Sequence, residues 1–190
     1  YFCPQSLFKV HPDMDEVFVK IIGTDSRAVL VFFQAGSRAI TLEFADRLAA
    51  RLASAGIQAK GQIKFLPRLN GDLFRSALGL ADVMLDTVHW SGGGTSLDAF
   101  AANVPVVTLP GTFMRGRQTA AMLRLMGLDS LVASDIDDYM AKAVELATNR
   151  GMNESTREII AAGKSNVFGR AEASIEFGDR IYSTVMAHAA

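Results

Sequence analysis

The sequence predicts an α/β protein whose parallel sheet is covered by helices on both faces. Short apolar runs rich in β-branched and aromatic residues alternate with segments of helical periodicity along most of the chain. The clearest run, AVLVFF at 28–33, is apolar at every position, which is typical of a strand buried on both faces. This alternation indicates a doubly wound, Rossmann-like sheet that ends in packed helices. Ligands of such sheets bind beyond the carboxyl ends of the strands.

Three strands and two helices are expected in the first 66 residues. Pro12 can occupy the first position of a helix, and acidic residues suit the turn that follows it, so a helix is predicted to about residue 22. A second helix is predicted over 37–55, because apolar residues recur at helical spacing and Gly56 ends the pattern. The three strands are expected at 1–3, 28–33 and 63–66.

The remaining chain continues the alternation and then becomes helical. Asn70 is expected to cap a helix, and three strands are expected at 83–86, 104–109 and 131–133. Further helices are expected at 97–103, at 115–126, from Ser134 or Asp135 to 149, from Asn153 or Ser155 to 164, and at 168–186. The apolar stripes of the helices at 37–55 and 168–186 are predicted to lie in the core.

The bulk properties favour one globular lobe, here taken as residues 1–190. The chain is 49% hydrophobic and 21% charged with a net charge of −1, and it has no basic cluster that would indicate nucleic-acid binding. Its one cysteine, Cys3, excludes a disulfide framework and a cysteine-rich metal site. The chain lacks an apolar run of membrane-spanning length and a signal peptide, so a cytoplasmic location is expected. Because it begins at Tyr1 within a predicted strand, we expect a fragment of a longer protein.

The segment LDTVHWSGGGTSLDAFAANVPVVTLPG, residues 85–111, carries the strongest local signal of a binding site. It is predicted to form a strand, a glycine loop, a helix and a second strand. Glycines before a helix allow backbone N–H groups to approach an anion, and the helix dipole favours negative charge there. The pattern therefore predicts a phosphate site at Gly92–Ser96.

Two other interpretations of the same residues stay open from the pattern alone. Thr95-x-x-Asp98 matches a helix capping box, and three glycines can simply form a tight turn. Asp86 ends a strand at the ligand edge and is interpreted as a carboxylate that organises the loop. The three histidines, His11, His89 and His188, show no metal-ligand spacing in the sequence, and no metal site is predicted.

Four segments carry a resemblance in their order and spacing. They are Lys9-x-x-Pro12; FLPRL with LADVMLDT (65–69 and 80–87); GGGTSLDAFAANVPVVTLPG (92–111); and Arg117 with MGLDSLVA (126–133). Together they resemble the C-terminal half of the catalytic region of the O-GlcNAc transferase (SPINDLY-like) family. The family consists of two-lobed GT-B glycosyltransferases, whose C-terminal lobe holds the nucleotide sugar. The resemblance implies that an N-terminal GT-B lobe and tetratricopeptide repeats accompany this lobe.

The resemblance also implies roles for the residues on the phosphate side of the site. Lys9 stands where the family has a lysine that touches the diphosphate, so it would stabilise the leaving UDP as the catalytic residue. Ser6 falls at a neighbouring position where the family often has an amide. Gly94, Thr95 and Ser96 correspond to the helix start that binds the anion. Gly93-Gly94-Thr95 stands where the family often has His-Thr-Thr, so a histidine contact is absent at Gly93.

The other implied contacts are to the nucleoside. Leu69 lies where backbone groups read the uracil edge, and Phe74 lies where an aromatic or histidine ring stacks on uracil. Asp98 would accept hydrogen bonds from the ribose hydroxyls. Arg117 matches an arginine that follows the Pro-Gly loop.

The implied activity is an inverting transfer of a sugar, GlcNAc by resemblance, from UDP to a protein Ser or Thr hydroxyl. The donor is a UDP-sugar, and neither a cofactor nor a metal is expected, because Lys9 and the helix start at Thr95 would neutralise the diphosphate. The isolated fragment is expected to bind UDP and to transfer little. Two alternatives remain from the sequence: a nucleotide-sugar epimerase with Asp86 or Asp98 near the sugar, and a non-catalytic binding domain that kept the fold.

Overall fold

The computed structural model describes residues 1–59 and 61–189 and contains one five-stranded parallel sheet. The strand order is β3-β2-β1-β4-β5. The strands are β1 (Phe2–Cys3), β2 (Leu30–Phe33), β3 (Ile63–Leu66), β4 (Met84–Leu85) and β5 (Val106–Val107). The helices are α1 (Asp13–Thr24), α2 (Arg38–Ser54), α3 (Gly71–Gly79), α4 (Gly94–Ala101), α5 (Gln118–Leu125), α6 (Ile136–Thr148), α7 (Arg150–Gly163) and α8 (Ala171–Ala189). The predicted α/β class with a parallel sheet is confirmed.

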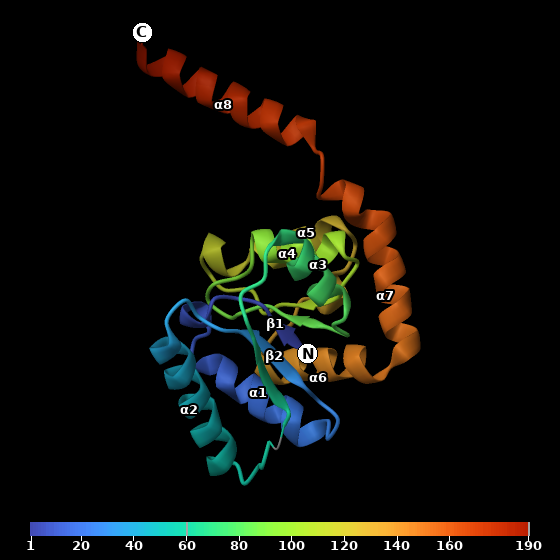
Figure 1. Cartoon of the computed structure of the whole chain (residues 1–190). Coiled ribbons are helices and arrows are strands. Elements are labelled where there is room, and N and C mark those ends of the chain that lie inside the picture. Colours follow the sequence, from blue (N-terminus) through green and yellow to red (C-terminus); the bar gives the residue numbers. More distant parts are fainter. Residues whose placement is uncertain (60, 190) are drawn as a thin grey trace.

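Helices cover both faces of the sheet, as a doubly wound fold requires. Helices α1, α2 and α6 lie on one side in Figure 1, and α3, α4 and α5 lie on the other. The chain moves outward from β1 to β3 and then returns to place β4 on the free side of β1. The direction of winding therefore changes between β1 and β4. Ligands of such sheets bind at this change, beyond the carboxyl ends of the two strands.

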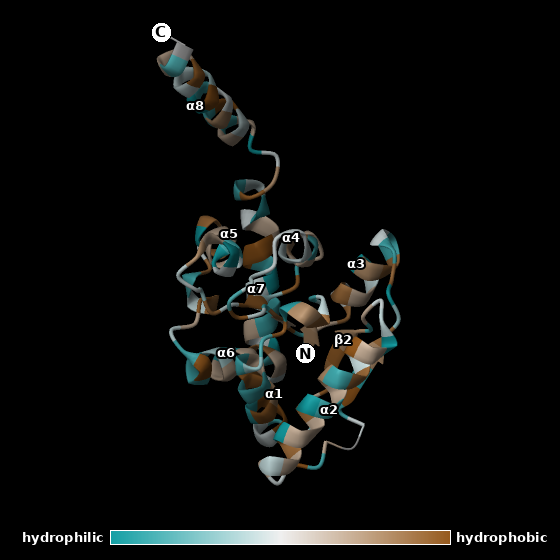
Figure 2. Cartoon of the chain, turned by 90° about the vertical axis from the view of Figure 1, so that its left-hand side faces the viewer, coloured by the Kyte–Doolittle hydropathy of each residue, from teal (hydrophilic) through white to brown (hydrophobic). Residues whose placement is uncertain are grey.

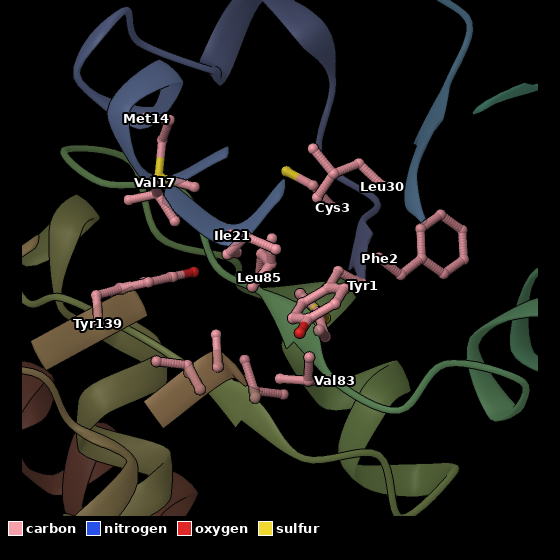
Figure 3. Close-up of a cluster of buried hydrophobic side chains, with 14 of the residues drawn as sticks. Tyr1, Phe2, Cys3, Met14, Val17, Ile21, Leu30, Val83, Leu85 and Tyr139 are labelled. Carbon is pink, nitrogen blue, oxygen red and sulfur yellow. The ribbon is translucent and has the colours of Figure 1, made fainter. Parts of the chain in front are cut away.

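The core is formed where α1 and α6 pack against the middle of the sheet. Figure 3 shows Met14, Val17 and Ile21 of α1 and Tyr139 of α6 around Leu85 of β4. All five side chains are fully buried. Removal of this much apolar surface from water is the main stabilising contribution to folding. The core thereby fixes the positions of β1 and β4. The loops of the candidate site extend from these two strands.

Two predictions for the part of the chain that follows β5 are wrong: a strand and the start of a helix. Residues 131–133 do not form a strand: the chain makes a 3-10 turn at Asp129–Leu131, and only a single bridge joins Thr108 to Val132. Helix α7 begins at Arg150 because the side chain of Asn149 accepts a hydrogen bond from the backbone N–H of Met152. Asn153, an expected cap, is instead buried and donates to the backbone oxygens of Asp82 and Leu146.

Helix α8 differs most from the prediction. Its apolar stripe is predicted to lie in the core, but the large residues of that stripe are exposed: Ile175, Ile181, Tyr182 and Val185. Figures 1 and 2 show α8 extending away from the body of the molecule with its brown apolar residues uncovered. Helical periodicity predicts which face is apolar but not what covers it. Within residues 1–59 and 61–189, no helix combines the length and the apolar character needed to cross a membrane.

The expected stripe of α2 is only partly buried. Phe44, Leu48 and Leu52 face the core, whereas Ile40 is 40% exposed. Ile40 lies one turn nearer the helix start and lines a cavity at the ligand edge of the sheet. The prediction that Ile40 lies in the core is therefore wrong.

Candidate functional site

The glycine loop after β4 is held by one buried carboxylate, Asp86. Its Oδ1 accepts a hydrogen bond from the backbone N–H of Gly92 at 2.6 Å. Its Oδ2 accepts from the hydroxyls of Thr108 at 2.7 Å and Ser91 at 2.8 Å. The hydroxyl of Tyr139 donates to the backbone oxygen of Asp86 at 2.8 Å. The interpretation of Asp86 as a loop-organising carboxylate is confirmed, and its burial excludes direct contact with a ligand in this conformation.

Burial and hydrogen bonding act on Asp86 in opposite directions. Burial raises the pKa of the Asp86 carboxyl, because the charged form loses its hydration. The donors from Gly92, Thr108 and Ser91 oppose this rise by stabilising the charged form. These same bonds define the path of the loop from β4 to α4. The loop is therefore held in place by hydrogen bonds to a buried side chain.

Helix α4 begins at Gly94 and has no side-chain cap. Gly93 occupies the N-cap position, and the first intrahelical bond joins the N–H of Leu97 to the oxygen of Gly93 at 3.1 Å. The N–H groups of Gly94, Thr95 and Ser96 consequently have no partner within the helix. The predicted helix start at 97 and the capping-box interpretation of Thr95 and Asp98 are both wrong. The geometry instead favours an anion at this helix start.

The two hydroxyls at this helix start point to different environments. Ser96 is fully buried, and its hydroxyl shares a 2.7 Å hydrogen bond with the hydroxyl of Thr119. Its side chain therefore supports the loop, and only its backbone N–H is available to an anion. Thr95 is half-buried, and its hydroxyl accepts a 2.5 Å hydrogen bond from the amide of Gln5.

Gln5 was not predicted from the sequence. It follows β1, its side chain is buried, and it bridges the loop after β1 to the start of α4. Ser6, the predicted neighbour of the phosphate, is exposed. The sequence could have indicated Gln5, because it is a polar residue shortly after a buried strand, at the edge where ligands of such sheets bind.

The glycines of the loop differ in the space around them, which gives a matched test. A Cβ on Gly92 would lie closer than 3.0 Å to side-chain atoms of Gln5, Thr95 and Ser96. A Cβ on Gly94 would meet no described atom within 4 Å. We expect Gly92→Ala to lower the free energy of unfolding by about 1–3 kcal/mol through overpacking, and Gly94→Ala to leave it unchanged or raise it slightly. Urea unfolding of both variants checks this, and equal losses would contradict the described packing.

Lys9 lies where the direction of winding changes. It ends a 3-10 turn, Leu7–Lys9, that follows β1. Its ammonium lies 5.5 Å from the ring centre of Trp90, which belongs to the loop after β4. The half-buried lysine thus reaches from the β1 loop to the loop that leads into α4. An ammonium in this position adds positive charge to the edge of the sheet that carries the uncapped helix start.

The three predicted residues Ser6, Leu69 and Phe74 line one cavity of about 550 Å³. The cavity lies beyond the ends of β1 and β2 and is bordered by the start of α3. Phe74 is half-buried, and its ring centre lies 5.5 Å from that of Phe33, so one side of the ring packs on the sheet. Gln5 lines the same cavity and contacts Thr95, which connects the cavity to the start of α4.

Asp98 and Arg117 do not line the cavity that Ser6, Leu69 and Phe74 share. Asp98 lies on α4, and its Oδ1 is 3.9 Å from a guanidinium nitrogen of Arg75 on α3. Its carboxylate is partly exposed, and the Arg75 contact joins the two helices beside the cavity. Arg117 is exposed at the start of α5, and no carboxylate in the described part of the chain pairs with it. The roles of both residues stay predictions.

The folded chain brings two histidines together that are far apart in the sequence. Nδ1 of His11 lies 3.2 Å from Oδ1 of Asp13, and Nε2 of His89 lies 2.7 Å from Oδ2 of the same carboxylate. The hydrogen bond with His89 lowers the pKa of Asp13. Spacing along the chain did not indicate that His11 and His89 meet, because it does not show which loops lie together in space.

The sequence of this chain matches a known protein family. The model of Glycosyl transferase family 41 matches residues 1–185. The chain is 29% identical over 122 residues to a tomato (Solanum lycopersicum) protein described as a probable UDP-N-acetylglucosamine–peptide N-acetylglucosaminyltransferase SPINDLY. It is 27% identical over 166 residues to the Arabidopsis thaliana protein SEC, which has the same description. The matches cover 61% and 85% of this chain, but only 13% and 16% of the relatives.

Solved structures share the fold. A mutant O-GlcNAc transferase of Thermobaculum terrenum superposes with a TM-score of 0.86 and 27% identity, over 100% of this chain and 37% of that one. The pneumococcal O-GlcNAc transferase GtfA, solved with UDP and GlcNAc, has a TM-score of 0.56 at 15% identity over 92% of this chain and 35% of its own. The latter likeness concerns the fold alone. The fold expected from the resemblance, the α/β lobe of a GT-B glycosyltransferase, is confirmed, and the chain belongs to glycosyltransferase family 41.

Proposed function

We propose that this chain is the UDP-sugar-binding lobe of a transferase that moves GlcNAc from UDP to a Ser or Thr hydroxyl of a protein. The observation that carries the proposal is the uncapped start of α4, held by the Asp86 hydrogen bonds beside the change in winding direction. A diphosphate has the charge that such a helix start favours. The relatives described as peptide N-acetylglucosaminyltransferases support the choice of donor and acceptor.

The cavity supports the placement of the nucleoside. Leu69, Phe74 and Ser6 line it, and Gln5 connects it to Thr95. A nucleoside in this cavity would extend its phosphates toward α4. Phe74 would stack on uracil through the ring face that Phe33 does not occupy. The aromatic ring supplies no hydrogen bond, so base recognition would depend on backbone groups near Leu69.

The charge at the site supports a reaction without a metal ion at the diphosphate. The leaving UDP gains negative charge as the glycosidic bond to the anomeric carbon breaks. Lys9 would stabilise this charge together with the N–H groups of Gly94, Thr95 and Ser96. Inversion at the anomeric carbon would follow from direct attack by the acceptor hydroxyl, which would give its proton to a base on the acceptor side as UDP leaves. The acceptor side would be built by an N-terminal lobe and tetratricopeptide repeats, so we expect this chain alone to bind UDP and to transfer little.

A thermal-shift measurement on this chain tests nucleotide binding. At about 100 times its dissociation constant, a ligand adds about 2.7 kcal/mol, or about 5–10 °C for a domain of this size. We expect UDP and UDP-GlcNAc to raise the melting temperature well above the effect of GDP, equally with and without Mg²⁺. UMP should shift it less, because it lacks the second phosphate that the helix start would bind.

The outcome separates the proposal from its alternatives. A stabilisation that depends on Mg²⁺, or that does not distinguish UDP from GDP, would contradict the proposed site. No stabilisation by any nucleotide would favour a non-catalytic domain, provided that the full-length protein also fails to bind UDP. Formation of an epimerised UDP-sugar by the full-length protein would favour an epimerase. The cytoplasmic location also stays a prediction.

A further inference from the structure

We propose that His11, Asp13 and His89 form a binding site for a divalent transition-metal ion of the zinc class. One donor atom from each of the three side chains lies within 4.8 Å of the others. Zinc bonds of about 2.0–2.2 Å in a tetrahedral arrangement separate neighbouring ligand atoms by about 3.3 Å. The 3.2 Å distance from Nδ1 of His11 to Oδ1 of Asp13 matches this separation, and the 2.7 Å hydrogen bond from Nε2 of His89 to Oδ2 is shorter. Small side-chain rotations would therefore place all three donors around one ion.

The two ligands from the first loop are held by the start of α1. The backbone N–H of His11 donates to the oxygen of Lys9 at 3.0 Å, and the oxygen of His11 accepts from Met14 at 2.9 Å. Asp13 is the first residue of α1. His11 and Asp13 thus leave the same helical turn on one side. Nδ1 of His11 lies 3.2 Å from the carboxylate and accepts a 3.3 Å hydrogen bond from the backbone N–H of Asp13, which a bound ion would replace.

The third ligand is presented by a strained backbone. His89 has a positive φ of 67°, which is uncommon for a residue with a side chain. Its backbone oxygen packs so closely on Gly116 that a Cβ there would lie 3.2 Å away. The neighbouring Ser91 N–H donates to the oxygen of Arg115 at 2.7 Å. The surrounding loop therefore fixes the direction in which the His89 imidazole leaves the chain.

The donor set selects the kind of ion. Two imidazoles and one carboxylate suit Zn²⁺, Ni²⁺, Co²⁺ or Cu²⁺, whereas Mg²⁺ prefers oxygen ligands and retains its water. The carboxylate supplies one negative charge, and the described lysines and arginines form no ion pair with it. All three side chains are exposed, so an ion can enter from solvent. Water, or a group from a bound molecule, would complete the coordination.

The three side chains lie next to Lys9 and Trp90. His11 is two residues from Lys9, and His89 precedes Trp90, whose ring lies under the Lys9 ammonium. A bound ion would cross-link the loops after β1 and β4, which flank the change in winding direction. It would thereby hold the Lys9–Trp90 pair. Metal binding by these three side chains requires no bound nucleotide.

Calorimetric titration of the metal-free chain with Zn²⁺, and absorbance titration with Co²⁺, test the site directly. We expect one ion per chain, visible Co²⁺ bands of a nitrogen–oxygen ligand field, and no heat of binding with Mg²⁺. His89→Ala, His11→Ala and Asp13→Asn should each weaken Zn²⁺ binding by at least about tenfold, because three ligands are the minimum for a fixed site. His188→Ala is the matched control, since it removes the remaining histidine, on α8, and should bind as the unchanged chain does.

Circular dichroism of each variant establishes that a loss of binding is not a loss of folding. The exposed positions of the three side chains make such unfolding unexpected. Zinc binding of unchanged strength in His89→Ala and Asp13→Asn would overturn the proposal, as would the absence of any saturable site. Neither result would bear on UDP binding, which is measured separately without transition metals.

Discussion

Replacing Lys9 with alanine in the full-length protein is expected to lower turnover by about 10²–10³-fold. The ammonium would act mainly on the charge that develops on the leaving UDP, which is larger in the transition state than in the bound substrate. UDP binding should therefore weaken far less than turnover, because the N–H groups at the start of α4 remain in place. Steady-state kinetics with UDP-GlcNAc and calorimetry with UDP measure the two effects.

Lys64→Ala is a suitable control for this prediction. Lys64 is an exposed lysine of β3, away from the change in winding direction, and the same loss of one positive charge should leave turnover unchanged. Lys9→Arg keeps the charge but replaces the compact ammonium with a planar group, so we expect partial activity. Unchanged turnover in Lys9→Ala would refute the catalytic role of this residue.

Asp86→Ala is expected to lower the free energy of unfolding by about 2–4 kcal/mol. The change leaves the backbone N–H of Gly92 and the hydroxyls of Ser91 and Thr108 without their shared acceptor in a buried environment. An unpaired buried donor loses its hydration without compensation. Denaturant unfolding measures the loss, and UDP titration of the folded variant should show weakened binding because the path into α4 is no longer held.

Two comparisons make the Asp86 prediction specific. Asp86→Asn keeps the size of the side chain and one oxygen acceptor, so it should cost less than alanine. Asp82→Ala, four residues earlier, removes an exposed carboxylate and should change stability by no more than about 0.5 kcal/mol. A loss below about 1 kcal/mol in Asp86→Ala would show that the loop does not depend on this carboxylate.

The sequence predicted the local features that depend on neighbouring residues. The run at 28–33 contains β2, and the glycine loop lies between β4 and α4 as its composition indicates. Because parallel strands end at one edge, the sequence order also indicated that the loops after β1 and β4 meet near the same ligand edge. The helix stripes showed which face is apolar, but whether that face is covered depends on distant packing. The prediction of an apolar stripe on α8 is therefore correct, but the prediction that this stripe lies in the core is wrong.

The site shows the same division between sequence and tertiary structure. The sequence by itself determined the parallel α/β fold, the glycine loop before a helix, and Asp86 as the residue that organises it. Only the tertiary structure decided that Ser96 faces the interior, that Gln5 reaches Thr95, and that His11 meets His89. Periodicity and turn composition act over a few residues, whereas these contacts join segments tens of residues apart. Their geometry follows from how the helices and strands pack, which no local pattern contains.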